Sequence, residues 1–248
     1  MLNLDRRAVQ YSAERLLTVL GIRQPKKLLI HIPKNGGMTI RHADQLKERV
    51  ILASRKRLKS PAYADRLLAT MKANGDHPGY EHARYRDVRL SIRKANNAFA
   101  VIRNPWSRVV SRFTFAVSAM DDGRAPEGYV PRDFEAFLEE RHVWGAREFF
   151  WHRAIRGWYP QLDYVVDESG DIAVDLLRLE HLSEETSRYF QLSASLDRRN
   201  KSARSKASYR QYYNARLIQI VADWYSRDIE TFGFDFDTAA ARNTLYAP

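Results

Sequence analysis

The sequence has no cysteine among its 248 residues. This absence excludes disulfide bonds and thiolate metal ligands, so the fold cannot depend on an oxidising compartment. It also lacks a run of about 18 apolar residues, which a membrane-spanning helix would need. Near the start, Asp5, Arg6 and Arg7 stand where a signal peptide would have its apolar centre. We therefore expect a cytoplasmic protein with no transmembrane segment. Peripheral contact with a membrane is compatible with this expectation.

Basic residues outnumber acidic ones. Lys and Arg total 41, Asp and Glu total 30, and the formal net charge is +11. This excess favours an anionic partner, such as a nucleotide, an acidic glycan, nucleic acid or a lipid surface, and charge alone does not choose among them. Hydrophobic residues make up 44% of the chain, which is enough for a packed core, and no Gly-, Ser- or Pro-rich linker divides it. We expect a single domain over residues 1–248, with a helical extension at 1–24.

Strand and helix patterns alternate along the chain, which is typical of a parallel sheet covered by helices. The fold class is therefore predicted to be α/β, with three α/β/α layers around a central, mostly parallel sheet. Apolar patterns predict strands near 27–32, 98–102 and 173–179, a hairpin over 163–174, and helices at 183–192 and about 208–230. The intervening segments are predicted to be mostly helical over 41–93 and a loop over 121–131.

The first candidate binding motif follows the strand pattern at 27–32 and opens a helical pattern. It consists of Lys34, Asn35, Gly36, Gly37, Met38 and Thr39. Two adjacent glycines let backbone N–H groups turn toward an anion, and the start of a helix adds positive potential. Lys34 supplies a charge and Thr39 a hydroxyl group. This chemistry suits a phosphate or a sulfate.

The second motif lies about seventy residues further along the chain. Arg103 stands at the end of the strand pattern 98–102, and Ser111 follows eight residues later in a helical pattern. A guanidinium grips a phosphate through a planar fork of donors, and a serine hydroxyl can add a hydrogen bond. In the first motif the lysine precedes the glycines, whereas a Walker A loop has it after them, which disfavours a simple ATPase or GTPase. Together the motifs predict one nucleotide site.

The order Lys-x-Gly-Gly-x-Thr, joined with Arg-x-Pro-x-x-Arg-x-x-Ser, resembles the sulfotransferases that use 3′-phosphoadenosine 5′-phosphosulfate (PAPS). More narrowly, it resembles their carbohydrate branch. The resemblance continues through residues 159–164, 177–182 and 200–202, and it covers a core of about 27–236. It implies a P-loop-like nucleotide-binding sulfotransferase fold, with PAPS as the donor and adenosine 3′,5′-bisphosphate (PAP) as the product.

In that family the lysine loop holds the 5′-phosphosulfate, and an arginine and a serine hold the 3′-phosphate. The resemblance assigns the first role to Lys34 and Thr39 and the second to Arg103 and Ser111. A basic loop that closes over the 3′-phosphate in the family implies Lys201 and Ser202 as further cofactor contacts, although a solvated loop is nearly as good an interpretation. Two positions of the first motif, Asn35 and Met38, depart from the commoner threonine and threonine-like residues. We expect these two residues to leave the 5′-phosphate with one hydroxyl contact fewer, while the backbone N–H donors of the loop remain.

Sulfuryl transfer requires in-line geometry, neutralisation of charge on the leaving oxygens and removal of the acceptor proton. Lys34 is predicted to stabilise the oxygen that bridges sulfate and phosphate. His82 is the predicted base, because its place resembles that of the histidine base of several glycan sulfotransferases and a neutral imidazole suits the task. Glu81 and His77 are its substitutes, and His31 is predicted to be structural. No His-x-x-x-His or paired-carboxylate spacing occurs, so we predict no catalytic metal.

Two features have alternative interpretations. The basic run 55–59 suits either a groove for an acidic glycan or a solvent-exposed helix face, and the second is favoured. A group of aromatic residues either stacks on sugar rings or belongs to the core. This group consists of Trp144, Trp151, Trp158 and Tyr159.

The favoured hypothesis is a PAPS-dependent sulfotransferase that acts on a hydroxyl of a saccharide or glycolipid, with no nucleic-acid partner. The alternative is a nucleotide-dependent phosphotransferase or kinase of related fold. That enzyme would require a lysine after the glycines and a carboxylate at a strand end to bind Mg²⁺. A nucleic-acid binder is a third hypothesis, supported by the charge alone.

Overall fold

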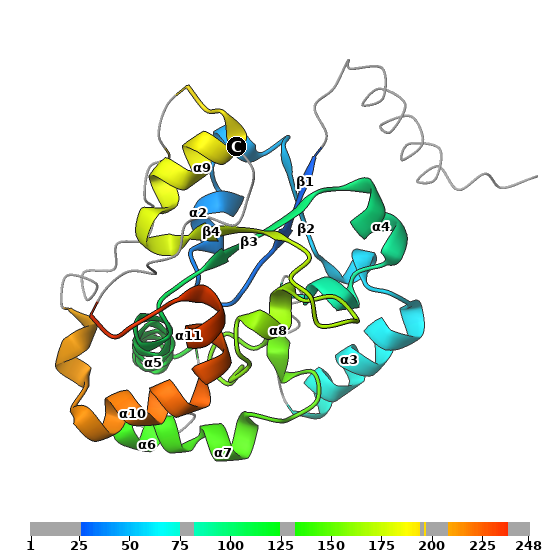
Figure 1. Ribbon diagram of the computed structural model, residues 1–248. Coiled ribbons are helices and arrows are strands. Elements are labelled where there is room, and N and C mark those ends of the chain that lie inside the picture. Colours follow the sequence, from blue (N-terminus) through cyan, green and yellow to red (C-terminus); the bar gives the residue numbers. More distant parts are fainter. Residues whose placement is uncertain (1–25, 75–81, 125–131, 194–195, 197–207, 238–248) are drawn as a thin grey trace, which may run out of the picture.

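The computed structural model describes residues 26–74, 82–124, 132–193, 196 and 208–237. A four-stranded sheet lies at the centre of these residues, with strand order β2-β1-β3-β4 and every neighbouring pair parallel (Figure 1). The strands are β1 (Lys27–Ile30), β2 (Val50–Leu52), β3 (Ala98–Ile102) and β4 (Asp175–Arg178). Every residue of β3 is buried, as expected for a parallel strand that is covered on both faces.

Helices make up most of the rest of the described chain. The α-helices are α2 (Gly37–Arg41), α3 (Pro61–Ala73), α4 (Leu90–Ala95), α5 (Pro105–Asp121), α6 (Phe134–Glu139), α7 (Arg141–Trp144), α8 (Leu162–Val165), α9 (Leu182–Phe190), α10 (Ala215–Trp224) and α11 (Ser226–Phe232). Short 3₁₀ turns occur at Asp44–Leu46, Arg55–Arg57, Tyr85–Asp87, Phe150–His152, Leu179–His181 and Tyr209–Tyr212.

The strands send alternate side chains into two apolar clusters, one on each face of the sheet. Leu29 and Phe99 belong to the smaller cluster, which includes side chains of α2 and α9. Leu28 and Ala100 belong to the larger cluster, which includes side chains of α3, α5, α8, α10 and α11. Figure 1 shows the same arrangement, with α2 and α9 on one side of the sheet and α5, α8 and α11 on the other. The predicted α/β class, with its three layers and parallel sheet, is confirmed.

The order of the strands places a ligand-binding edge between β1 and β3. The chain adds β2 on one side of β1 and then returns to add β3 on the other side. Open α/β sheets bind ligands beyond the carboxyl ends of the strands at such a reversal. His31 directly follows β1 and Arg103 directly follows β3, so the two predicted motifs begin at this edge.

Helix α5 begins where the second motif predicts a helix. Pro105 occupies its first turn, and the Asn104 side chain accepts a hydrogen bond from the Ser107 N–H over 3.2 Å. Proline at the first helical position and asparagine at the N-cap are the preferred residues of a helix start. The local sequence therefore fixes the point at which Arg103 leaves the strand and the helix begins.

Two local predictions are wrong in part. In the predicted hairpin over 163–174, the first arm is helix α8, while Val166 and Ile172 form an antiparallel bridge that closes the predicted turn. The predicted helix at 208–230 is divided into a 3₁₀ turn, α10 and α11. It is interrupted because Asn214 is extended and its side chain caps a new helix by accepting from the Leu217 N–H at 2.9 Å.

Strand β2 is not among the predicted strands, because three residues form too short an apolar pattern to separate from a helix. The basic run 55–59 is not a simple exposed helix face. Arg57 turns back toward the chain and donates to the Leu52 carbonyl at 3.1 Å and to the Ser54 hydroxyl at 3.0 Å. Lys56 and Lys59 are exposed.

The predicted N-terminal extension at 1–24 lies outside the described residues, as does most of the predicted loop at 121–131. Among the helices of the described ranges, none has the length and apolar character that a membrane span requires.

Candidate active site

Arg103 links the two predicted motifs directly. Its Nη1 donates a hydrogen bond to the backbone carbonyl of Lys34 over 2.9 Å. Its Nε and Nη2 both donate to the Ser107 hydroxyl, at 3.0 and 2.8 Å, in the first turn of α5. Burial lowers the pKa of Arg103 to about 10, and Glu180 opposes this shift. The guanidinium therefore stays charged at neutral pH and lies beside the lysine loop.

Lys34 combines a strained backbone with a cation that has no acidic partner in the described chain. Its φ is +67°, in the left-handed region that non-glycine residues rarely adopt. Its Nζ lies 3.9 Å from the ring centroid of Phe115 in α5. Burial lowers the pKa of Lys34 to about 8, and the nearby Arg103 and Arg124 guanidiniums add to the shift. An ammonium that is partly buried among cations is costly unless an anion joins it.

The two glycines of the first motif are required for different reasons. Gly36 has a φ of +76°, and a Cβ there would also press on the Leu179 side chain. Gly37 opens helix α2 without a left-handed φ, but a Cβ there would overlap the imidazole of His31. The second glycine is therefore a packing requirement, because the His31 ring lies against the start of the helix.

His31 also contacts the predicted base. The Nδ1 of His82 lies 2.9 Å from the backbone carbonyl of His31, and the two ring centroids are 4.5 Å apart. A carbonyl can only accept, so this bond requires the proton on Nδ1 of His82. In the neutral ring the lone pair is then on Nε2, which is the arrangement that a base uses.

His31 is predicted to be structural, and its surroundings agree with a neutral ring. Its side chain is buried, and its pKa is well below the ordinary value because of burial and the neighbouring His82, Arg41 and Lys34. Its Nδ1 is buried with no hydrogen-bond partner.

A second buried histidine, His152, was not predicted from the sequence. Its Nδ1 contacts the Phe149 carbonyl, so the proton is on Nδ1 and the lone pair on Nε2. Burial lowers the pKa of His152 to about 4, against the opposing effect of the Phe149 carbonyl, and Arg153 and His82 lower it further. A neutral imidazole therefore lies near His82.

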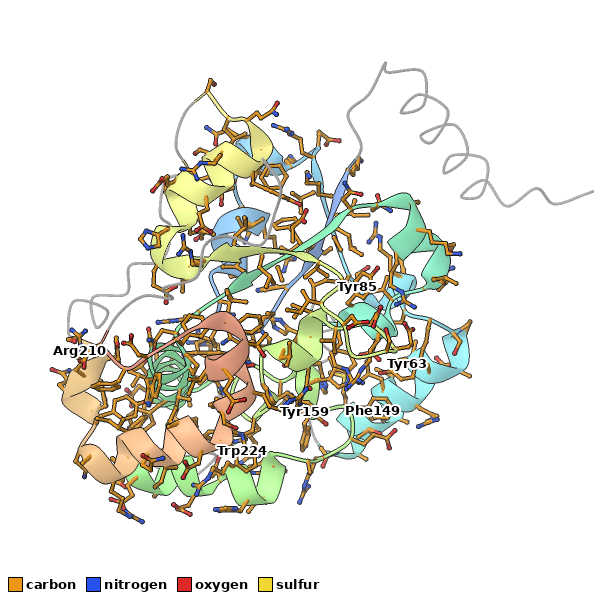
Figure 2. The ribbon with its side chains drawn as sticks, in the orientation of Figure 1. Tyr63, Tyr85, Phe149, Tyr159, Arg210 and Trp224 are labelled. Atoms are coloured by element: carbon orange, nitrogen blue, oxygen red, sulfur yellow. The ribbon has the colours of Figure 1, made fainter. Side chains whose placement is uncertain are left out.

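Arg84, two residues after His82 in the sequence, packs on two aromatic rings. Arg84 lies over the rings of Trp151 and Tyr159, with distances to the centroids of 5.3 and 5.9 Å. Asp87 neutralises this arginine through an ion pair of 2.7 Å and accepts a hydrogen bond from the Tyr63 hydroxyl at 2.8 Å. Tyr159 and Tyr63, which both belong to this group, are labelled in Figure 2.

The aromatic group of the sequence analysis divides between the two interpretations. Trp151 and Trp158 are core residues, with 0% and 1% of their surface exposed. Trp144 and Tyr159 are only partly buried. Tyr159 is therefore the member of the group that could meet a ligand beside Arg84.

The other predicted contact residues have different environments. The Asn35 side chain faces the interior, where its Nδ2 donates to the Val101 carbonyl at 2.7 Å. Thr39 is buried, Met38 is 41% exposed, and Ser111 is partly buried in α5.

Ser111 lies one turn beyond Ser107, on the same helix face. Arg103 contacts Ser107, and the role of Ser111 stays a prediction. The predicted Lys201 and Ser202 lie outside the described residues.

Several residues that build the site were missed by the sequence analysis. They are Ser107, Arg108, Phe115, His152, Gln161 and Asp228. Arg108 and Gln161 lie inside segments that carry the family resemblance, and that is the signal that could have marked them. Phe115 and Asp228 carry no signal, because an aromatic or acidic residue in a helix is ordinary. For a metal, the described ranges hold no group of three His, Cys, Asp or Glu side chains that could act as ligands.

An open α/β sheet with a cationic site at its switch point is thus the class that the fold and the site define. No protein-family model matches the sequence, and no curated protein matches it. Among solved structures, the chain is similar to a sulfotransferase from Alicyclobacillus acidocaldarius. The two are 14% identical, the match covers 90% of this chain and 92% of that one, and the TM-score is 0.34.

We expect Lys34→Met to raise the free energy of unfolding at pH 7 by about 1–3 kcal/mol, because the variant no longer buries an ammonium among cations. The pKa of Lys34 is about 8 in the folded chain and 10.5 in its reference state. The penalty is therefore full below pH 8 and is relieved as the pH rises toward about 10.5. Urea denaturation should show that the difference in free energy of unfolding between Lys34→Met and the unmodified chain is smaller at pH 9.5 than at pH 7. Equal stabilities at pH 7, or a widening gap, would contradict the assignment.

Gly37→Ala should lower the free energy of unfolding by roughly 1–3 kcal/mol, because its Cβ overlaps the His31 ring. Thermal unfolding measures the change. His31→Ala in the same chain should recover part of the loss, since it removes the overlapping ring. Gly123→Ala is the matched control, because Gly123 has a φ of +66° and open space around it, so only backbone strain acts there. Strictly additive losses in the double variant would refute the packing explanation.

Proposed function

We propose that this chain is a sulfotransferase that moves the sulfuryl group of PAPS to a hydroxyl of a carbohydrate or glycolipid acceptor. The observation that carries the proposal is the 2.9 Å contact between the Arg103 guanidinium and the Lys34 carbonyl. It places a planar donor fork and a loop with a cation side by side at the switch point of the sheet. A donor with a 3′-phosphate and a 5′-phosphosulfate has anionic groups that match these two features.

Lys34 has the properties of a group that stabilises a leaving oxygen. Its ammonium is partly buried, and no carboxylate pairs with it in the described chain. In such surroundings a charge that develops on the bridging oxygen is stabilised more strongly than in water. The N–H groups of Gly37 and Met38 occupy the first turn of α2, where a helix has no internal acceptor for them. They would serve the non-bridging oxygens.

His82 is the proposed base for the acceptor hydroxyl. Its Nδ1–H donates to the His31 carbonyl, and this bond orients the ring and leaves Nε2 as the basic nitrogen. The same residue, His31, packs against Gly37 at the loop. The base is therefore anchored next to the proposed phosphosulfate site. Arg84, two residues further along the chain, and the Tyr159 ring against it would contact the acceptor.

Binding of PAP tests the donor assignment. We expect PAP to raise the melting temperature by several degrees, and ATP with Mg²⁺ to raise it little, because the site offers a second cation for a 3′-phosphate. Arg103→Ala should abolish the shift. Arg66→Ala is the control, because Arg66 forms an exposed pair with Glu148. A larger shift with ATP and Mg²⁺ would favour the phosphotransferase alternative, and equal binding of any polyanion would favour a nucleic-acid binder.

Turnover tests the base. Transfer of labelled sulfate from PAPS to a panel of glycan and alcohol acceptors should fall by about 100-fold or more in His82→Ala, while the PAP-induced shift in melting temperature is retained. His142→Ala is the matched control, since His142 is exposed and contacts the exposed Glu139 and the Trp224 ring. Normal transfer by His82→Ala would show that another group removes the proton.

A further inference from the structure

Gln161 forms paired hydrogen bonds with the peptide groups of Arg103. Its Oε1 accepts from the Arg103 N–H at 2.8 Å, and its Nε2 donates to the Arg103 carbonyl at 2.8 Å. The Gln161 side chain is 0% exposed. A buried side-chain amide that bonds both polar groups of one residue fixes the backbone there. The position of the Arg103 guanidinium depends on this residue, although 58 positions separate the two in sequence.

The same amide also holds the lysine loop. Oε1 of Gln161 accepts a second hydrogen bond, from Asn35 Nδ2, over 2.6 Å. Asn35 directly follows Lys34, and its Nδ2 also donates to the carbonyl of Val101 in β3. Gln161 is thus a bridge between the two loops that carry the proposed anion contacts, and it needs no ligand to be in place.

A third segment fixes the orientation of the amide. Oδ2 of Asp228 in α11 accepts from the Gln161 backbone N–H at 2.8 Å and from its Nε2 at 3.2 Å. Oδ1 of Asp228 accepts from the Leu162 N–H at 2.9 Å. Two N–H donors face Oε1, and two oxygen acceptors face Nε2. If the amide were flipped, its NH₂ group would face the two donors and its oxygen would face the two acceptors. Only glutamine supplies both functions at this position.

Arg108 makes a parallel connection between the same parts of the chain. Its Nε donates to the Pro33 carbonyl at 3.3 Å, and its Nη1 donates to the Tyr159 carbonyl at 3.0 Å. Pro33 precedes Lys34, and Tyr159 lies two residues before Gln161. The lysine loop is therefore held at both ends to the segment around Gln161.

We propose that Gln161 is a positioning residue that sets the distance between the two anion subsites, one at the Lys34 loop and one at Arg103. It contacts no ligand itself. Its effect is to make a ligand with two phosphates on one ribose bind more tightly than a ligand with either phosphate alone, because the subsites are already at the right spacing. This inference rests on the proposed nucleotide site.

The test compares PAP with 5′-AMP and 3′-AMP by isothermal titration calorimetry. We expect PAP to bind the unmodified chain about 100-fold more tightly than either monophosphate. In Gln161→Met this advantage should fall about tenfold, while the affinities for both monophosphates change less than about threefold. Gln161→Leu likewise removes both hydrogen-bonding functions without adding a charge, and it should behave like Gln161→Met. Gln219→Met is the control, because Gln219 is an exposed glutamine of α10.

Asn35→Ala removes the bond between Gln161 and the lysine loop, together with the Asn35 bond to the Val101 carbonyl, and leaves the bonds between Gln161 and Arg103 in place. It is the test to use if the Gln161 variants do not fold. Asn35→Ala should lower the affinity for PAP relative to 5′-AMP and 3′-AMP, while the affinities for the two monophosphates change little. An unchanged advantage in Asn35→Ala, or equal losses for all three ligands in folded Gln161 variants, would overturn the inference. If the unmodified chain itself shows no preference for PAP, the proposed nucleotide site fails and the inference fails with it.

Discussion

The site depends on one contact, in which the Arg103 guanidinium bonds to the backbone carbonyl of Lys34. It joins the residue after β3 to the loop after β1, and it does so at the point where the strand order reverses. The guanidinium bonds to carbonyl and hydroxyl oxygens there, and the Glu180 carboxylate nearby favours its charged form. The ammonium of Lys34 lies in the same region over Phe115. Two cations thus accumulate at the edge of the sheet, and a bound anion would relieve their repulsion.

Backbone strain and unsatisfied polar groups occur around the same residues. Lys34 has a left-handed backbone, its ammonium has a lowered pKa, and the buried polar atoms His31 Nδ1 and Asn35 Oδ1 have no partner in the described structure. Backbone strain and unsatisfied polar groups persist where the surrounding structure enforces them, and they are frequent at functional sites. Directly beside Lys34, Asn35, Gln161 and Asp228 form a buried hydrogen-bond network. The remainder of the sheet is an ordinary apolar core on both faces.

The sequence predicts the parts of this account that have a strong local signal. Alternating patterns gave the α/β class, and the glycine pair, Lys34 and Arg103 marked the loops that the fold brings together. Strand β2 was missed because it is three residues long, and the helix at 208–230 was drawn too long because the Asn214 cap resembles any polar residue in a helix. Gln161 lies inside a segment that carries the family resemblance, but its role, like that of Asp228, depends on partners 58 to 126 positions away and is not visible in the local sequence.

Ser107 is a second residue whose contact with Arg103 the local sequence does not reveal. The resemblance pointed to Ser111, eight residues after Arg103, while the guanidinium of Arg103 bonds to Ser107, one helical turn earlier. Both serines lie on one face of α5, so spacing alone does not separate them. A ligand between the guanidinium and Ser111 would use the same face.

A crystal structure of the chain with adenosine 3′,5′-bisphosphate tests the central claim most directly. The account predicts that the 3′-phosphate lies against the Arg103 guanidinium and the 5′-phosphate in the loop of Lys34, Gly36 and Gly37. A bisphosphate bound elsewhere, with Arg103 and Lys34 both directed away from its phosphates, would contradict it.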